Sequence, residues 1–292
     1  MDTIKRKHNS GEHIVHRFTS LAEAARFAEA NPNPKSSAKE TDREWSGTKS
    51  LPEAVHLAVD GWHDVRPEVQ KMFDSLESQL ALALDEQYAI RYDYSGDSVD
   101  MGRYVSGDPE CMMDYVTEPQ ARMGKVVRIM VAGVASAYVT PEQIRARGVA
   151  VCALVDVLHK MGVGIELWTE QCYLRHDGGY GNRKPSTKRY SMLVKLHDSA
   201  DMMDIDDIMY AIAHPSMLRR IGFAGVEQME WATEFTSNAY GMPDDMQCAD
   251  LVGDVDVTVE KLQNGGRWGS EDAILKDPVG WVLNTVRGLD LL

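Results

Sequence analysis

Apolar residues recur at helical spacing in the first third of the chain. Two stretches, 20–30 and 50–60, share the pattern S-L-x-E-A-x-x-x-A, with serine at a helix N-cap and glutamate three residues later, which is the spacing of a capping box. Residues 67–82 continue with a longer helical pattern. We therefore predict N-terminal helices, one of which lies between Trp45 and Trp62 and packs on the rest of the chain through those two rings.

The centre of the chain replaces this periodicity with continuous apolar runs. Residues 125–139 are rich in β-branched and small apolar side chains, as buried strands are. Thr140 and Pro141 then provide an N-cap and a first helical residue, and Gly162 follows about six turns later. Residues 164–174 read as a second strand. Strand, long helix and strand together predict a βαβ unit with parallel strands.

The remainder alternates in the same way. We expect a strand over 190–197, a helix over 204–227 with a break near His214 and Pro215, a strand within 250–262 and a closing helix over 277–292. This alternation predicts an α/β fold with an open, mostly parallel sheet and flanking helices, Rossmann-like in its general plan and preceded by the N-terminal helices.

Composition divides the chain into three regions. The stretch NPNPKSSAKETDRE, residues 31–44, is rich in proline, serine and charge and has almost nothing to bury. We therefore expect a mobile arm or linker over residues 1–44, a helical segment over 45–88 and the α/β domain over 89–292.

The charge limits the possible partners. The 292 residues include 45 acidic and 31 basic ones, for a formal charge of −14, which repels phosphate groups and makes nucleic acid an unlikely partner. No apolar run approaches the ~20 residues of a membrane span, so we expect no membrane partner. The N-terminus lacks the apolar core of a secretory signal, and the four cysteines show no C-x-x-C spacing, so reduced thiols in a cytoplasm are expected.

One acidic stretch is a candidate metal site. Asp93, Ser95 and Asp97 follow an apolar run, and oxygen ligands on a loop after a strand suit Mg²⁺ or Ca²⁺. The alternative is an ordinary polar turn. The stretch resembles the D-x-S-x-S motif of the von Willebrand factor A family, with Asp97 in place of the last serine. Residues 126–161 also resemble the first βα unit of that family, where only Ser136 keeps a ligating side chain. The resemblance implies a von Willebrand A-like α/β fold with a degenerate metal site.

A second candidate site is the glycine-rich, basic loop of residues 176–189. Flexible glycines let backbone amides approach an anion, so Arg183, Lys184 and Lys188 are candidates for binding a phosphate or a nucleic-acid strand. Ser136 and Thr140 are further candidate ligand-binding residues, at the start of the long helix. The alternative is an exposed, solvated loop.

Three segments resemble a family of uncharacterised bacteriophage proteins: WSGTKSLPEAVHLAVDGW, VDMGRYVSGDPECM and RGVAVCALVDVLHKMGVGIEL. The resemblance implies a phage origin and a place in the host cytoplasm or the virion, and it transfers no catalytic residue. The chain also lacks the H-E-x-x-H and G-x-S-x-G motifs.

From these observations we expect a non-enzymatic, phage-encoded protein that binds a protein of the phage or the host, with Trp45 and Trp62 as candidate contacts and without catalytic residues or a cofactor. Two alternatives stay open. One is a metal-dependent enzyme that acts on phosphate esters or nucleic acid through Asp93 and Asp97. The other is a nucleic-acid-binding accessory protein that uses the basic loop.

Overall fold

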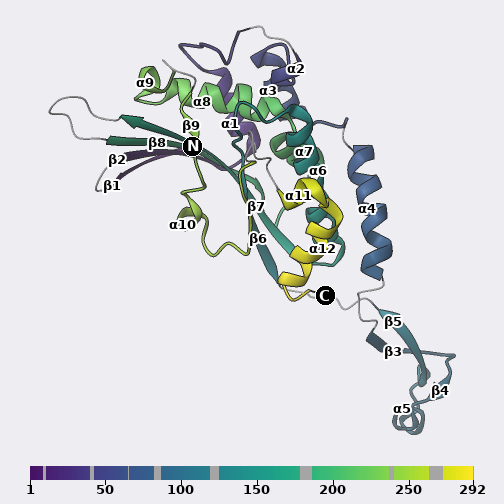
Figure 1. Ribbon diagram of the computed structural model, residues 1–292. Helices are drawn as coiled ribbons and strands as arrows, with labels where there is room; N and C mark the ends of the chain where they lie inside the picture. The colour runs from purple at the N-terminus through teal and green to yellow at the C-terminus, as the bar shows by residue number, and fades with distance from the viewer. Residues whose placement is uncertain are drawn as a thin grey trace.

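A twisted central sheet forms the body of the protein (Figure 1). The computed structural model describes residues 1–8, 11–39, 43–64, 66–81, 87–118, 125–177, 186–236, 240–262 and 272–291. The strand order is β1-β2-β8-β7-β6-β10, and β9 pairs with β7. The strands are β1 (Asp2–His8), β2 (Gly11–Phe18), β6 (Val126–Ala132), β7 (Gly164–Asp177), β8 (Ser186–His197), β9 (Met242–Pro243) and β10 (Val257–Val259).

The predicted βαβ unit is confirmed. β6 and β7 pair in parallel and are joined by α6 (Pro141–Lys160), which begins at a capping box formed by Thr140 and Gln143. β10 and β2 add further parallel pairs, with β6 and β8, whereas β1–β2 and β7–β8 are antiparallel hairpins. The α/β class is therefore confirmed, with a central sheet of mostly parallel character flanked by helices.

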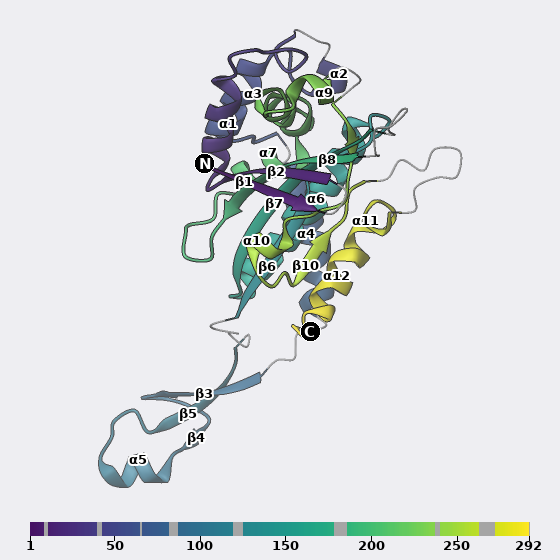
Figure 2. The same ribbon diagram turned by 90° about the vertical axis from the view of Figure 1, so that its left-hand side faces the viewer.

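Most helices cover one face of this sheet and enclose the main core (Figure 2). The opposite face carries a smaller core of five buried residues beneath the short helix α10 (Ala249–Val252). The other helices of the body are α1 (Leu21–Glu29), α2 (Arg43–Ser46), α3 (Leu51–Asp60), α4 (Arg66–Ala81), α7 (Ile205–Ala213), the π-helix η1 (Met217–Gly222), α8 (Phe223–Gln228), α9 (Ala232–Thr236), α11 (Ala273–Lys276) and α12 (Pro278–Gly288).

Residues 1–44 differ from the arm that their composition suggests. β1 and β2 are strands of the main sheet, and β2 pairs along its whole length with β8. Further along, Glu227 accepts hydrogen bonds from the amides of Lys35 and Ser37, at 3.1 and 3.0 Å. The physical reason for the difference is that hydrogen bonds with buried groups far away in the sequence hold this segment. The composition of the segment shows only that it has little apolar surface to bury.

A second, separate sheet comes from the middle of the chain. Residues 87–118 form three antiparallel strands in the order β3-β5-β4 with a short helix, and we call them the projecting unit because Figures 1 and 2 show them standing away from the body. From the sequence, residues 89–118 are expected inside one α/β domain over 89–292, and residues 87 and 88 at the end of the helical segment. The elements are β3 (Gln87–Asp93), β4 (Ser98–Val99), α5 (Met101–Ser106) and β5 (Met112–Glu118).

Among the helices that the structure describes, none combines the length and the apolar character that crossing a membrane requires.

Candidate partner-binding surface

Exposed apolar side chains concentrate on the projecting unit. Of the fourteen large apolar residues that are exposed in the described part of the chain, seven lie between residues 90 and 115. The remaining seven are scattered over the body, as isolated surface apolar residues usually are. The seven in the projecting unit are Ile90, Tyr94, Val99, Met101, Tyr104, Val105 and Tyr115.

The register of the small sheet places apolar side chains on one of its faces. Ile90 pairs with Tyr115, and Tyr92 pairs with Met113, so these two cross-strand pairs share a face. Ile90 and Tyr115 are 48% and 55% exposed. Arg103 of α5 covers the other end of the face, with its guanidinium 3.7 Å from the centre of the Tyr92 ring. Half of the apolar face is therefore left open to solvent.

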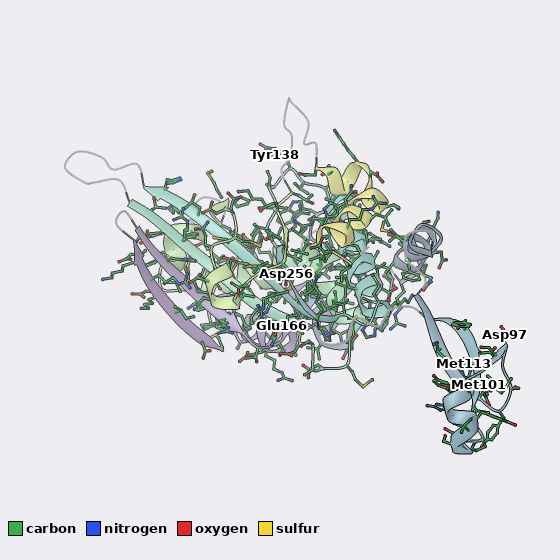
Figure 3. The ribbon with its side chains drawn as sticks, turned by 90° about the horizontal axis from the view of Figure 1, so that it is seen from below. Asp97, Met101, Met113, Tyr138, Glu166 and Asp256 are labelled. Atoms are coloured by element: carbon green, nitrogen blue, oxygen red, sulfur yellow. The ribbon has the colours of Figure 1, made fainter. Side chains whose placement is uncertain are left out.

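Helix α5 turns a second apolar surface outward. Met101, Tyr104 and Val105 stand at positions i, i+3 and i+4, which form one helical stripe, and they are 63%, 63% and 79% exposed. Arg103 points from the opposite side of the helix toward the sheet. Figure 3 labels Met101 beside Met113 at this end of the molecule. The helix therefore contacts its own sheet through an arginine and presents its apolar stripe to solvent.

Local hydrogen bonds fix α5 in this position. The Asp100 carboxylate accepts hydrogen bonds from the amides of Gly102 and Arg103, at 2.8 and 3.2 Å, and one from the Tyr92 hydroxyl at 3.1 Å. The hydrogen bond from the Arg103 amide is the main reason that the pKa of Asp100 is lowered. Gly107 ends the helix in the left-handed conformation, with φ of 77°. These caps shape the helix without a core beneath it.

The side chains that the structure describes in the projecting unit enclose no core. Between residues 90 and 115 no side chain is buried, and the same stretch carries six acidic and two basic residues, for a formal charge of −4. A three-stranded sheet needs a buried apolar face for stability in water. The unit thus combines uncovered apolar side chains with a strongly acidic rim.

The predicted metal residues lie at the turn between β3 and β4 of this unit. The Asp93 carboxylate accepts a hydrogen bond from the Tyr94 amide at 2.7 Å, and the Asp97 amide donates to Asp114 at 3.2 Å. Ser95 is exposed beside them. These are the hydrogen bonds of a polar turn. No third His, Cys, Asp or Glu in the described ranges gathers with Asp93 and Asp97 in a possible metal site, so a metal site here stays a prediction.

The predicted anion-binding residues are separately engaged. The Ser136 hydroxyl lies 3.5 Å from the Tyr138 amide, and the Thr140 hydroxyl accepts the Gln143 amide in the cap of α6. Lys188 forms an ion pair with Glu234 at 2.6 Å. Arg183 and Lys184 lie outside the described residues. Anion binding therefore also stays a prediction.

The two tryptophans around α3 pack on the segment that follows α7. Trp62 is buried, and its ring meets that of His214 edge-on with 4.5 Å between the centres. Trp45 is 41% exposed and lies beside Phe223, 6.1 Å between ring centres. Both rings therefore attach α3 to the body, as the sequence suggested, and only Trp45 keeps an appreciable surface for a partner.

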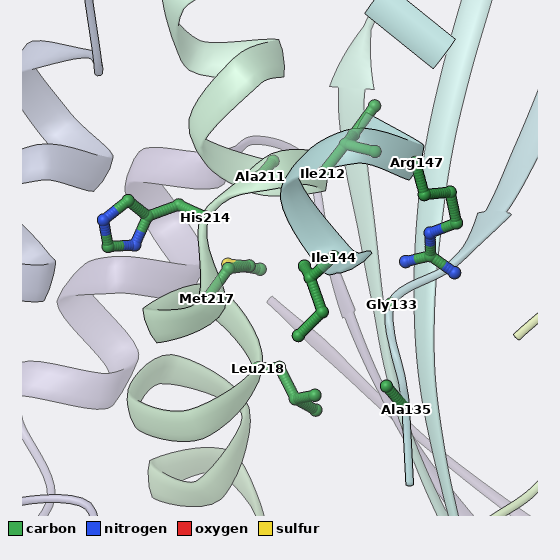
Figure 4. Close-up of a pocket in the computed structure, with 9 residues that line it drawn as sticks. All are labelled: Gly133, Ala135, Ile144, Arg147, Ala211, Ile212, His214, Met217 and Leu218. Carbon is green, nitrogen blue, oxygen red and sulfur yellow. The ribbon is translucent and has the colours of Figure 1, made fainter. Parts of the chain in front are cut away.

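A small cavity in the body lies among α6, α7 and η1 (Figure 4). It holds about one water molecule, so it offers no room for a substrate. The buried Arg147 on its wall donates from Nη1 to the Glu260 carbonyl at 3.2 Å, while its Nε has no hydrogen-bond partner among the described residues. A bound water is the simplest group to complete this arginine.

Sequence reasoning missed the surface on the projecting unit. The spacing of Met101, Tyr104 and Val105 is readable in the sequence, but a six-residue helix is too short for periodicity to separate it from a loop.

Comparisons with known proteins identify a family and no activity. The family described as Domain of unknown function (DUF7192) matches residues 4–289. No curated protein and no solved structure matches the chain.

Proposed function

The chain belongs to the family Domain of unknown function (DUF7192), whose description names no activity, so we propose a function from the geometry: the protein acts by binding another protein through the projecting unit. The binding surface consists of the α5 stripe, Met101, Tyr104 and Val105, together with the open part of the sheet face at Ile90 and Tyr115. We propose no catalytic step for this surface.

One observation carries the proposal: the projecting unit buries none of its side chains between residues 90 and 115. Covering an apolar side chain of this size contributes about 1.5–3 kcal/mol, so five such side chains provide a strong driving force for association. A folded partner that covers them would supply the core that the unit lacks.

The charge of the unit indicates the chemistry of the partner. Its formal charge of −4 favours a partner surface with lysine and arginine around apolar residues, and it opposes pairing of two such units. Methionine is unbranched and adapts to an irregular partner surface, and tyrosine provides a large ring with a hydroxyl that suits an interface. We therefore propose a basic, apolar surface on a different protein.

The proposed setting follows the bacteriophage resemblance. We propose a phage origin, a place in the host cytoplasm or the virion, and a partner encoded by the phage or the host. The von Willebrand A resemblance is retained as a proposal about the sheet of the body alone, since the projecting unit lies outside that sheet.

The test compares two exposed tyrosines in the full chain, one on the projecting unit and one on the body. A photo-crosslinking amino acid replaces Tyr104 in one protein and Tyr138, which is 80% exposed on the body, in the other. Both are expressed in the host cells, irradiated, and analysed by mass spectrometry. We expect a crosslinked protein at Tyr104 that is absent at Tyr138. With that partner purified, Tyr104→Ser raises the dissociation constant roughly thirtyfold, which corresponds to a loss of about 2 kcal/mol of binding free energy.

The matched control is Tyr138→Ser, which removes an even more exposed tyrosine from the body, 80% against 63% for Tyr104, and leaves the affinity unchanged. The absence of any crosslink at Tyr104 would contradict the proposal, as would equal affinity of the two serine variants. A crosslink between two copies of this chain would show that the surface mediates self-association, and it would overturn the proposal of a basic partner surface on a different protein.

A further inference from the structure

The sheet face opposite the main helices holds a cluster of polar and sulfur-bearing side chains. His13 comes from β2, and Glu170 and Cys172 come from β7, and they are 2%, 0% and 0% exposed. One ligating atom of each lies within 4.8 Å of those of the other two. Residues 244–256, which we call the cover segment, run across this face with α10 (Figure 2). The cluster thus lies between the sheet and the cover segment.

Two further residues complete the cluster. The Ser191 hydroxyl lies 2.8 Å from His13 Nε2 and donates to Glu170 Oε1 at 2.5 Å. The thiols of Cys172 and Cys248 both lie within hydrogen-bonding reach of Ser191, and the Cys248 thiol also contacts Glu170. An imidazole, a carboxylate and the Cys172 thiol therefore surround one small volume, and the Cys248 thiol lies at its edge.

The buried carboxylate is the unusual member of this group. In the described part of the chain no lysine, arginine or terminal amine forms an ion pair with Glu170. Its Oε2 accepts hydrogen bonds from the amides of Gln247 and Cys248, at 2.9 and 3.0 Å. Buried carboxylates are usually paired with a cation or bound to a metal ion.

We propose that His13, Glu170, Cys172 and Cys248 bind a zinc ion that fastens the cover segment to the sheet. Imidazole nitrogen and thiolate sulfur favour Zn²⁺ over Mg²⁺ or Ca²⁺, which select oxygen ligands. Four protein ligands leave no open position, so the site is structural. Binding releases the two thiol protons to water as the Zn–S bonds form.

For His13, Glu170 and Cys172 the geometry requires only small movements, and the Cys248 thiol has to move in from the edge of this group. Ligand atoms around a tetrahedral zinc ion lie roughly 3.3–3.8 Å apart, so the three atoms now within 4.8 Å contract by about 1 Å. The Ser191 hydroxyl turns away from the centre and keeps its hydrogen bond to Glu170, which orients that ligand. The ligands come from β2, β7 and the cover segment, so the ion crosslinks positions 13 and 248.

The test is metal binding by the full-length protein. Elemental analysis after dialysis against zinc gives one ion per chain, and cobalt in its place gives the thiolate-to-cobalt charge-transfer absorption. Cys172→Ser and His13→Gln each lower zinc affinity about tenfold or more. The controls are Cys111→Ser on the projecting unit and Cys152→Ala in α6, which both keep one zinc per chain. A chelator lowers the thermal midpoint of the wild type, and added zinc restores it.

Three results would overturn the proposal: no zinc in the wild type after dialysis, cobalt bound without a thiolate band, or zinc affinity unchanged in Cys172→Ser. Should a variant fail to fold, the cobalt spectrum of the wild type decides by itself. The site and the proposed protein binding are independent, because the cluster lies in the body and crosslinking at Tyr104 reports on the projecting unit.

Discussion

Two adjacent arginines of η1 organise chain segments that are remote in sequence. Arg219 donates from Nη2 to the Val139 carbonyl at 2.6 Å, and Arg220 donates from Nη2 to the carbonyls of Thr48 and Lys49, at 3.1 and 3.0 Å. Burial lowers the pKa of Arg219 to about 10. Both guanidinium groups donate mainly to main-chain oxygens, and Arg220 also donates to the Ser46 hydroxyl, so they work as rigid forks that fix loops.

Two buried histidines make stability depend on pH. His16 in β2 lies 3.1 Å from the Tyr190 hydroxyl, and His214 lies 2.7 Å from the Ser216 hydroxyl. Burial lowers the pKa of each to about 4, from 6.5. Their neutral forms fit the folded protein, whereas the unfolded chain takes up protons at higher pH. This stabilisation is therefore complete above pH 6.5 and is lost as the pH falls toward 4.

We predict that His16→Gln reduces this pH dependence. At pH 5 a histidine with these two pKa values has lost about 2 kcal/mol of its contribution. The difference in unfolding free energy between pH 7 and pH 5, measured with urea, is therefore smaller by about 2 kcal/mol in the variant than in the wild type. His56→Gln, on the exposed side of α3, serves as the control and keeps the wild-type difference. Equal pH dependence of all three proteins would contradict this account.

At the scale of elements, the closest helix contact in the main core depends on one glycine. A Cβ at Gly148 of α6 would lie 2.3 Å from Cβ of Ala213 in α7. The helices can therefore approach this closely only because residue 148 has no side chain. Both helices lie on the same face of the sheet, so their spacing also sets how the chain enters the break at His214 and Pro215.

We predict that Gly148→Ala destabilises the protein by about 2 kcal/mol, because overpacking outweighs the gain in helix propensity. The matched control is Gly288→Ala at the end of α12, where a Cβ meets no atom within 4 Å. This control is neutral or slightly stabilising. Thermal unfolding of both variants provides the measurement, and a Gly148→Ala protein as stable as the wild type would show that the two helices separate at little cost.

At the scale of the whole molecule, the body and the projecting unit differ in how much apolar surface they bury. The body encloses a large apolar core on one side of its sheet, whereas no side chain between residues 90 and 115 is buried. Much of the stability therefore resides in the body. The projecting unit contributes an acidic, apolar surface at a distance from it, as Figure 3 shows for Asp97 and Met101 against Tyr138.

We predict that replacing residues 87–118 by a short glycine–serine linker leaves the body folded. The thermal midpoint of the body shifts by no more than about 2 °C, because the deletion removes little of its buried surface. The partner identified through Tyr104, once purified, no longer binds the shortened protein. A large drop in the thermal midpoint, or loss of cooperative unfolding, would show that the unit stabilises the body.

The sequence by itself determined the elements whose signals are local. The caps at Ser20, Ser50 and Thr140 and the break before Pro215 are confirmed, as is the βαβ unit, because hydrogen-bonding caps, proline geometry and apolar runs act between near neighbours.

Only the tertiary structure decided what depends on distant neighbours. No local sequence pattern shows where residues 1–39 lie in the fold. β2 needs β8 as a partner, and Glu227 holds the segment after α1 from almost 200 residues away. Three residues, at positions 13, 170 and 172, became a cluster only when the strands paired, and the cover segment then brought Cys248 to its edge. Exposure of the apolar stripe on α5 likewise depends on what folds against it, and pairing and burial are properties of the assembled chain that no window of sequence contains.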